Sequence, residues 1–452
     1  MKSKQELKNL FENGDKPVQE DFWQWQDSYW HKEEKITMEK ISGLEDGLPN
    51  PSHIYAEIDA DGKASLKSYL TKKLIIKEGT LSVPDNFAYD MKLTEVEIPD
   101  SVITIGNSSF ASNRLMNIDL PDNLTSIGYS AFNNNILENL TIPSSVTSIG
   151  SNAFSVNKLT RVTIPDSVTY LGSNAFNTNL LSEVRISQNI QGIEDATFSS
   201  NRLVSVDLPS GITYIGYGAF SNNQLTAISL PDHVARIGDY AFAYNQLSTL
   251  VIPPAVIEIG QFAFQNNLLR EVTLSSGLTK IGNYAFLDNQ IERISIPNTV
   301  TEIGQHAFMN NPLKEVTLSS GLSKIPAELF KDKQLSGIEI PHGVSEIGSL
   351  SFYNNQLSEV RISESVESIG YYAFGKNKLT QLELPNISLT IEELAFADNE
   401  LTSVIIPENV ALIKSFAFGN NQLTQVTLGS NTQYYHASFD GNVEVIGGEM
   451  IG

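Results

Sequence analysis

Phenylalanine recurs at a constant interval of 22 residues through most of this chain. A repeat in constant phase means that each position forms a column down a stack of coils, and each coil buries its apolar side chains only against its neighbours. The length of 452 residues therefore indicates one elongated solenoid and not several globular domains. The repeated positions are Phe110, Phe132, Phe154, Phe176, Phe198, Phe220, Phe242, Phe264, Phe286, Phe308, Phe330, Phe352, Phe374, Phe396 and Phe418.

The unit at residues 225–246, LTAISLPDHVARIGDYAFAYNQ, represents the others. Its first residues alternate apolar and polar, which predicts a half-buried strand. Pro231 ends this strand because proline has no N–H to donate to a ladder. Stacked about 4.8 Å apart, the strands are expected to form one long parallel sheet. Its exposed columns include Thr249, Glu271, Arg293 and Glu315 and, two residues later in each coil, Val251, Thr273, Ser295 and Thr317.

The second part of each unit has the pattern V-x-x-I-G-x-x-A-F. The four- and five-residue spacing from Ile to Ala and Phe predicts a short helical or 3-10 turn that packs inward. Asparagine follows the phenylalanine by three residues in fourteen of the fifteen units, and Lys333 is the exception. An amide at this position can bond backbone groups of adjacent coils, whereas an ammonium cannot accept a hydrogen bond, so Lys333 predicts a weaker coil.

The two ends of the stack need caps that cover apolar core and strand edges. Residues 70–92 resemble a degenerate first coil, with Phe87 in the phenylalanine position and Asp90 in the asparagine position. Regular units then occupy residues 93–428, and residues 429–452 are expected to close the far end. Residues 49–69 form a linker in which Asp61 and Gly62 predict a hairpin turn. A calcium loop is not favoured there, because Lys63 occupies a ligand position.

Residues 1–48 differ from the repeats and are expected to form a small helical module. Ser3 and Glu6 have capping-box spacing, and Pro17 can start a second helix. The module holds all three tryptophans, which is more aromatic surface than so short a segment easily buries alone. It is therefore expected to mediate attachment or oligomerisation, by docking on another copy or on a larger assembly. The aromatic residues concerned are Phe22, Trp23, Trp25, Tyr29 and Trp30.

Two resemblances follow from these motifs. The pattern L-x-x-V-x-I-P-x-x-V-x-x-I-G-x-x-A-F-x-x-N-x, over about residues 74–428, resembles the BspA-like leucine-rich repeats of bacterial surface proteins. It implies a right-handed leucine-rich-repeat solenoid used for adhesion or recognition. The opening KQELKNLFENGDKPVQEDFWQWQDSYWHKEEKI is similar to the start of tail-fibre-like proteins of phages and phage-derived injection systems. That similarity implies that the N-terminus attaches to a particle.

Composition and motifs argue against several classes of function. The net charge of -22 disfavours nucleic acid and anionic membrane surfaces as partners. No cysteine is present, and the six histidines have no metal-site spacing. Residues 370–377 nearly match a phosphate loop, but Asn377 replaces the Ser or Thr that holds magnesium. With no nucleophile elbow either, we expect no enzyme, no cofactor and no metal, although a carboxylate pair at glycosidase separation stays open.

Two groups of residues are candidates for ligand binding. The first lies on the expected strand face, and its alternative role is to keep the sheet soluble as solvated charge. The second is an aromatic ladder two residues before the repeat phenylalanine, on which a sugar or a partner protein could stack. Its alternative role is half-buried packing. The strand-face group is Arg293, Glu315, Glu339, Glu359, Arg361 and Glu383, and the ladder is Tyr240, Phe262, Tyr284 and His306.

The function expected first is a receptor-binding, tail-fibre-like component of a phage or phage-derived particle, whose solenoid binds a cell-surface protein or glycan. The N-terminal module would contact the particle or a second copy. The start of the chain lacks the apolar core of a signal peptide, which fits assembly in the cytoplasm before the particle is released. No apolar run is long enough to insert into a membrane. The alternative is a BspA-like adhesin that is secreted or held on a bacterial surface.

Overall fold

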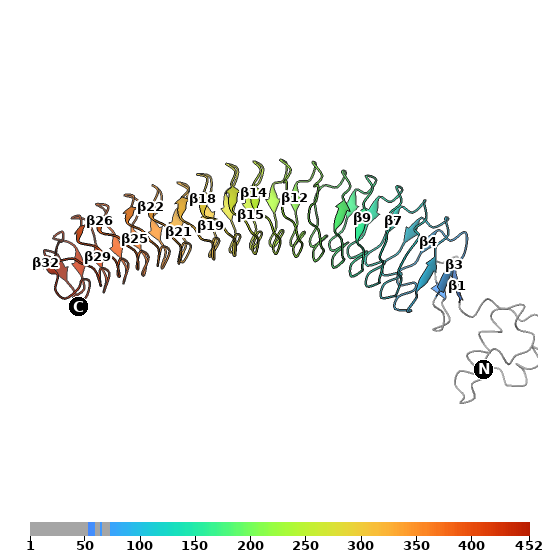
Figure 1. The fold of residues 1–452 in the computed structure, drawn as a ribbon, viewed down its shortest axis with the longest axis horizontal. Coiled ribbons are helices and arrows are strands. Elements are labelled where there is room, and N and C mark those ends of the chain that lie inside the picture. The colour runs from blue at the N-terminus through green and yellow to red at the C-terminus, as the bar shows by residue number, and fades with distance from the viewer. Residues whose placement is uncertain (1–52, 59–63, 66–72) are drawn as a thin grey trace, which may run out of the picture.

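The computed structural model describes residues 53–58, 64–65 and 73–452. The module expected at residues 1–48, with Phe22, Trp23, Trp25, Tyr29 and Trp30, lies outside the described residues. The described chain forms an arched stack of coils, with the earliest repeats at one end and residue 452 at the other (Figure 1). Among the described residues the regular elements are all β-strands. The solenoid expected from the repeat is therefore confirmed.

One set of strands begins many of the coils and pairs with the equivalent strands of neighbouring coils; we call it the first ladder. Its pairs are parallel, and each residue lies opposite its equivalent in the next coil, as Thr249 lies opposite Glu271. Its strands are β3 (Lys73–Ile76), β5 (Glu95–Glu97), β9 (Arg161–Thr163), β11 (Glu183–Arg185), β14 (Thr249–Val251), β16 (Glu271–Thr273), β18 (Arg293–Ser295), β20 (Glu315–Thr317), β22 (Gly337–Glu339), β24 (Glu359–Arg361), β26 (Gln381–Glu383), β28 (Ser403–Ile405), β30 (Gln425–Thr427) and β32 (Glu444–Ile446).

A second ladder is formed by two-residue strands that come later in each unit, after the proline position represented by Pro231. The expectation of one long sheet was wrong: the second ladder consists of sheets of five, five and seven strands, and the first ladder of shorter pieces. The strands of the second ladder are β4 (Ser82–Val83), β6 (Thr104–Ile105), β7 (Ser126–Ile127), β8 (Ser148–Ile149), β10 (Tyr170–Leu171), β12 (Tyr214–Ile215), β13 (Arg236–Ile237), β15 (Glu258–Ile259), β17 (Lys280–Ile281), β19 (Glu302–Ile303), β21 (Lys324–Ile325), β23 (Glu346–Ile347), β25 (Ser368–Ile369), β27 (Thr390–Ile391), β29 (Leu412–Ile413), β31 (Gln433–Tyr434) and β33 (Glu449–Met450).

The first ladder begins inside the range that was expected to be a linker. Strand β1 (His53–Ile58) pairs in parallel with β3, and β2 (Ala64–Ser65) pairs antiparallel with β1. An antiparallel pair joined by a short connection is the arrangement that the Asp-Gly signal predicts. The connecting residues 59–63 themselves lie outside the described residues.

The segment around each repeat phenylalanine, which we call the Phe turn, is not helical, so the prediction of a helical or 3-10 turn was wrong. Residues two before and two after the phenylalanine have positive φ, as in Tyr240 and Tyr244, both at 57°. The Tyr240 N–H donates to the Gln261 carbonyl at 2.9 Å, and the Phe242 N–H donates to the Ala263 carbonyl at 2.8 Å. A helix would direct these donors back along its own segment. Here they bond the next coil and form a third column of backbone hydrogen bonds.

The phenylalanine column is the centre of the core. Phe264 is fully buried, and its ring stacks on Phe242 at 5.5 Å and on Phe286 at 5.7 Å between centroids, with planes within 7° of parallel. Offset stacks at this separation add attraction to the burial of the rings themselves. Each ring therefore contributes to two coil-to-coil contacts.

The asparagine column makes the hydrogen bonds that the sequence predicted. The Nδ2 group of Asn267 donates to the carbonyls of Phe242 and Phe264 at 3.0 and 3.1 Å. Its Oδ1 accepts the Leu247 N–H at 3.0 Å. One buried amide thus satisfies backbone groups of two coils that would otherwise be desolvated without a partner.

The phase of the N-terminal cap differs from the one expected. The Ala88 N–H donates to the Ser109 carbonyl, just as the Phe110 N–H donates to the Ala131 carbonyl one coil later, so Ala88 and not Phe87 occupies the phenylalanine position. Phe87 instead packs edge-on against Phe110 at 6.4 Å. Asp90 has φ of 56° and lies at the left-handed position of the Phe turn, so its assignment to the asparagine position was wrong.

The far end continues the stack. Phe439 comes slightly early for the regular spacing from Phe418, yet the two rings stack at 5.3 Å with planes 7° apart. Strands β32 and β33 extend the first and second ladders beyond the last regular unit. Residues 429–452 therefore add a shortened coil to this end of the stack.

One junction between coils, which we call the seam, is incompletely bonded. In the described part of the chain, no backbone hydrogen bond of the second ladder or of the Phe turn joins the coil of Phe308 to the coil of Phe330. Pro326 occupies the position held by Gly304 and Gly348 in adjacent coils, and it has no N–H to donate. The Phe308 and Phe330 rings are 6.2 Å apart. Pairing of β18 with β20 in the first ladder still joins the two coils.

Lys333 lies at the seam, in the position of the missing asparagine. Its side chain is buried, and burial lowers its pKa to about 8. The Leu313 N–H, which an asparagine amide would accept, has no hydrogen-bond partner within the described residues. Two neighbouring departures from the repeat, Pro326 and Lys333, therefore support the prediction of a weaker coil.

Candidate functional site

The first ladder presents two columns of outward side chains, because the middle residue of each strand points into the core. In β18, Arg293 and Ser295 are exposed while Ile294 is buried. The six charged residues proposed from the sequence are all exposed on this ladder: Arg293, Glu315, Glu339, Glu359, Arg361 and Glu383. The structure therefore places them on one accessible face, as expected.

Charges on this face are paired between adjacent coils. The Arg293 guanidinium lies 3.3 Å from the Glu315 carboxylate, and the Lys314 ammonium lies 2.9 Å from the Glu292 carboxylate. The Lys314 hydrogen bond holds the pKa of Glu292 below its ordinary value. Neighbouring positions thus carry opposite charges, and these contacts orient the long side chains against one another.

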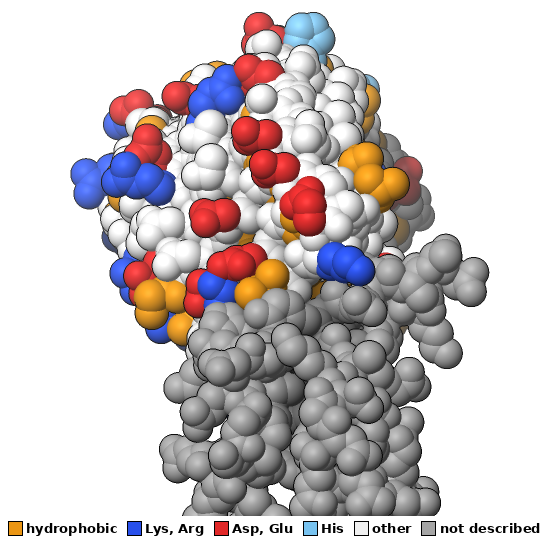
Figure 2. All heavy atoms as spheres, turned by 90° about the vertical axis from the view of Figure 1, so that its right-hand side faces the viewer, with side chains coloured by type: hydrophobic (Ala, Val, Ile, Leu, Met, Phe, Trp, Pro, Cys, Tyr) orange, Lys and Arg blue, Asp and Glu red, His pale blue; other side chains and the backbone are white. Residues whose placement is uncertain are grey.

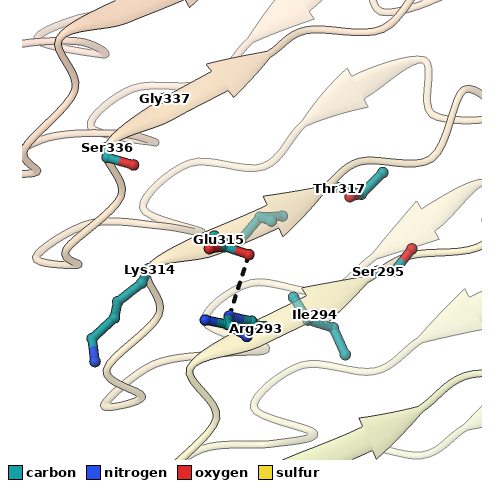
Figure 3. A pocket seen from close by; sticks show the side chains of 9 residues that line it. Arg293, Ile294, Ser295, Lys314, Glu315, Thr317, Ser336 and Gly337 are labelled. Atoms are coloured by element: carbon teal, nitrogen blue, oxygen red, sulfur yellow. Dashed lines mark ion pairs between the residues drawn. The ribbon is translucent and has the colours of Figure 1, made fainter.

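A shallow hollow of about 490 Å³ lies beside these ion pairs (Figure 3). It exists because Gly337 occupies the column position held by Glu315 in one neighbouring coil and Glu359 in the other. A Cβ at Gly337 would meet only Glu359, its side chain at 3.5 Å and its carbonyl oxygen at 3.9 Å, so the backbone there leaves room for a side chain. The lining includes Arg293, Ser295, Lys314, Glu315, Thr317, Ser336 and Gly337.

The remaining predicted residues lie around this hollow and beyond it. Glu359 is on the far side of Gly337, directly opposite it in the strand register. Glu339 and Arg361 are register partners in the second exposed column, and Glu383 follows one coil later. Gly337 itself was not predicted from the sequence, although a glycine in a column of long polar side chains was a visible signal.

The aromatic ladder is continuous, but its rings present edges and not faces. Centroids are 4.7 Å apart from Tyr240 to Phe262, 4.8 Å from Phe262 to Tyr284 and 5.1 Å from Tyr284 to His306. Tyr217 extends the ladder, 5.5 Å from Tyr240. Because each inner ring has a neighbour on both faces, a sugar has no aromatic face to lie on within the ladder. The geometry favours half-buried packing between coils for these residues.

A metal centre requires clustered ligand side chains, and a helical membrane span requires a long apolar helix. Among the described residues, no group of three or more His, Cys, Asp or Glu side chains is placed to hold a metal ion. Nor does that part of the chain contain a helix long and apolar enough to cross a membrane. The candidate site is the strand face with its hollow, which the geometry of the first ladder presents.

The repeat pattern and the fold match those of known proteins. A family model described as "BspA type Leucine rich repeat region" matches overlapping segments that together span residues 82–445. The chain belongs to this family. The matched segments of this BspA-type protein are 82–204, 137–247, 171–290, 236–357 and 323–445.

The fold is also similar to that of a solved structure. A leucine-rich repeat protein from Bacteroides ovatus is 22% identical, with 90% of this chain and 100% of that one covered and a TM-score of 0.53. A leucine rich cell surface protein from Faecalibacterium prausnitzii is 20% identical, with 82% and 92% covered and a TM-score of 0.36. No curated protein matches the sequence significantly. The first of these similarities supports the fold of the BspA-type chain.

Proposed function

We propose that this BspA-type solenoid is a recognition protein, whose first-ladder face binds a cell-surface protein or glycan without catalysing a reaction. The observation that carries the proposal is the hollow at Gly337, which lies on an open face between side chains held by ion pairs. Hydroxyl groups of Ser295, Thr317 and Ser336 surround it, and these both donate and accept hydrogen bonds. Such groups suit sugar hydroxyls and peptide backbone alike.

The same geometry disfavours catalysis. Rate enhancement relies on charge stabilisation in a site that excludes water, and an enclosed pocket provides this. The hollow at Gly337 is shallow, and the Glu315 carboxylate beside it is already paired with Arg293. A rigid, open ladder with preset charges is better suited to binding an extended partner.

Filling the hollow tests the binding face. We expect Gly337→Gln to weaken attachment of the labelled full-length protein to target bacteria by about tenfold or more, because a side chain would displace the ligand. Glutamine at the equivalent position of β26, Gln381, shows that the ladder accommodates it. Attachment is measured by flow cytometry over a panel of bacterial cells and on a glycan array.

The matched control is Thr249→Gln, which adds the same side chain to the same column two coils before Arg293. It is expected to bind as the unsubstituted chain does. Equal loss of binding in both variants would indicate a general effect on the face, and unchanged binding of Gly337→Gln would place the ligand elsewhere.

The finer proposal is that the protein acts as a receptor-binding, tail-fibre-like component of a phage or phage-derived particle, outside the cell once released. It is supported by the resemblance of residues 4–36 to the start of such proteins. A BspA-like adhesin, secreted or held on a bacterial surface, is the second candidate. The family of the solenoid favours it, since these repeats resemble those of bacterial surface proteins.

Removal of the N-terminal segment distinguishes these two roles. A chain of residues 50–452 keeps β1 and its pairing with β3, so we expect it to stay folded. On the particle proposal it no longer co-purifies with particles, because Trp23, Trp25 and Trp30 provide the contact. All three tryptophans lie in the removed segment, so their fluorescence in the full chain reports attachment directly. Undiminished co-purification of residues 50–452 would contradict the attachment role.

A further inference from the structure

The second ladder carries charges that alternate in sign over six successive coils. The residues occupy the first position of strands β13, β15, β17, β19, β21 and β23, and every one is exposed or half-exposed. We call them the charge column: Arg236, Glu258, Lys280, Glu302, Lys324 and Glu346.

The charged side chains remain exposed to solvent even where they form ion pairs within the solenoid. The Lys280 ammonium lies 3.4 Å from the Glu258 carboxylate and 3.5 Å from the Glu302 carboxylate, and both raise its pKa. The three side chains nevertheless remain 41%, 46% and 62% exposed in the order Lys280, Glu258, Glu302. Alternation prevents like charges from facing each other in register. It also leaves a row of outward-directed charges of both signs.

The charge column is electrically neutral on a strongly acidic molecule. Three cations and three anions cancel within it, whereas the whole chain has a net charge of -22. The column beside it is uncharged and comprises Ala235, Ile257, Thr279, Thr301, Ser323 and Ser345. Figure 2, by contrast, shows acidic side chains gathered over the described N-terminal end. Repulsion between two acidic copies of the chain is therefore reduced where the charge columns meet.

We propose that the charge column binds a second copy of this chain in antiparallel orientation. Read from its first to its last coil, the column is plus, minus, plus, minus, plus, minus, so a copy turned end over end opposes every charge with its opposite. Arg236 then faces Glu346 of the second copy, Glu258 faces Lys324, and Lys280 faces Glu302. Two-fold symmetry repeats each contact, as in most homodimers. Ile257, 55% exposed beside Glu258, adds apolar area.

The contact is small and electrostatic. Six coils at about 4.8 Å span roughly 24 Å, so a narrow stripe of this length buries less than the ~800 Å² per partner of a standard interface. The dimer is therefore weak and is screened by salt. The contact uses the second ladder, whereas the hollow at Gly337 is lined by residues of the first ladder. The inference does not rest on the proposed function.

Inverting all six charges distinguishes a contact between two copies from ion pairing between the coils of one chain. The inverted chain carries Arg236→Glu, Glu258→Lys, Lys280→Glu, Glu302→Lys, Lys324→Glu and Glu346→Lys. It keeps the alternation, the net charge and the complementarity to itself. Facing the unsubstituted chain, however, it meets a like charge at every position. The proposal thus predicts that each chain pairs with its own kind and that the mixed pair is excluded.

Disulfide cross-linking reads out the pairing. The chain has no native cysteine, so Thr279→Cys in one batch and Thr301→Cys in another introduce single thiols that face each other across the proposed contact. At low ionic strength we expect mild oxidation to cross-link both like pairs, and the mixed pair about tenfold less. Molar salt should abolish the difference. Cross-links at these sites are independent of any association through residues 1–48.

Two results would overturn the proposal. Equal cross-linking in all three mixtures would show that the charges do not direct pairing, and preferential cross-linking of the mixed pair would contradict the antiparallel arrangement. Thermal unfolding followed by circular dichroism checks that the inverted chain folds. Should it not fold, the central exchange Lys280→Glu with Glu302→Lys provides the same test, because that chain still complements itself while repelling the unsubstituted one at its centre.

Discussion

Replacing Phe264 by alanine is expected to lower the free energy of unfolding by about 3–5 kcal/mol. The ring is fully buried and stacked on both faces by Phe242 and Phe286, so its loss leaves a cavity that the two neighbouring coils cannot fill without breaking their own hydrogen bonds. In a stack that is stabilised only by nearest neighbours, one such cavity weakens two interfaces at once. Denaturant unfolding followed by circular dichroism measures the change.

Tyr170→Ala is the matched control. It removes an aromatic ring from an exposed position of β10 and is expected to change the free energy of unfolding by no more than ~0.5 kcal/mol. If the two variants unfolded at the same denaturant concentration, the phenylalanine column would not be the core that the geometry indicates.

Lys333→Asn is expected to stabilise the chain by about 3 kcal/mol at neutral pH. The buried ammonium has a pKa of about 8 in the folded chain, compared with 10.5 ordinarily, so folding at pH 7 includes the cost of desolvating the charge. Asparagine removes that cost, and it can accept the Leu313 N–H as Asn355 accepts that of Leu335 at 3.1 Å. Unfolding curves of the two chains between pH 7 and pH 10.5 provide the measurement.

The pH dependence has a definite sign. Above pH 8 the folded chain releases the Lys333 proton while the unfolded chain keeps it until about pH 10.5, so raising the pH through this window stabilises the unsubstituted chain. The advantage of Lys333→Asn should therefore be largest below pH 8 and shrink towards pH 10.5. Lys158→Asn, on an exposed lysine, is the control and should show no such trend. A constant difference across the window would mean that desolvation is not its cause.

Most of the fold was predictable because one rule is repeated fifteen times. A column of Phe or Asn cannot arise from a single local accident, and the roles deduced for Asn267 and for the exposed strand columns were confirmed. The Phe turn was not predictable by the same means. Its spacing fits a helix, and residues such as Tyr240 have no local preference for positive φ. Hydrogen bonds to the next coil impose that conformation. They cannot be deduced from one unit, because the accepting carbonyls lie in the following unit.

The candidate site was predicted in part. The sequence placed Arg293, Glu315 and Glu359 on an exposed face, but the hollow depends on the side chain that Gly337 lacks. The alternation from Arg236 to Glu346 was visible in every unit of that stretch. It was missed because the Ile-Gly segment was interpreted as the start of a helical turn. In the structure that segment is a strand of the second ladder, so its charged residues form an exposed column.

The seam divides the molecule into unequal lengths of well-bonded coils. In a linear array, the free energy of the interfaces between coils couples the unfolding of one coil to that of the next. A weak interface therefore allows the two sides to unfold as separate blocks. The block before Pro326 holds the longer run of regular coils, while the block after it begins with the buried Lys333. Tension applied along the rod would open this junction first. Among the described coils the seam is thus the expected point of mechanical yield, and the hollow, whose lining runs from Arg293 to Gly337, extends across it.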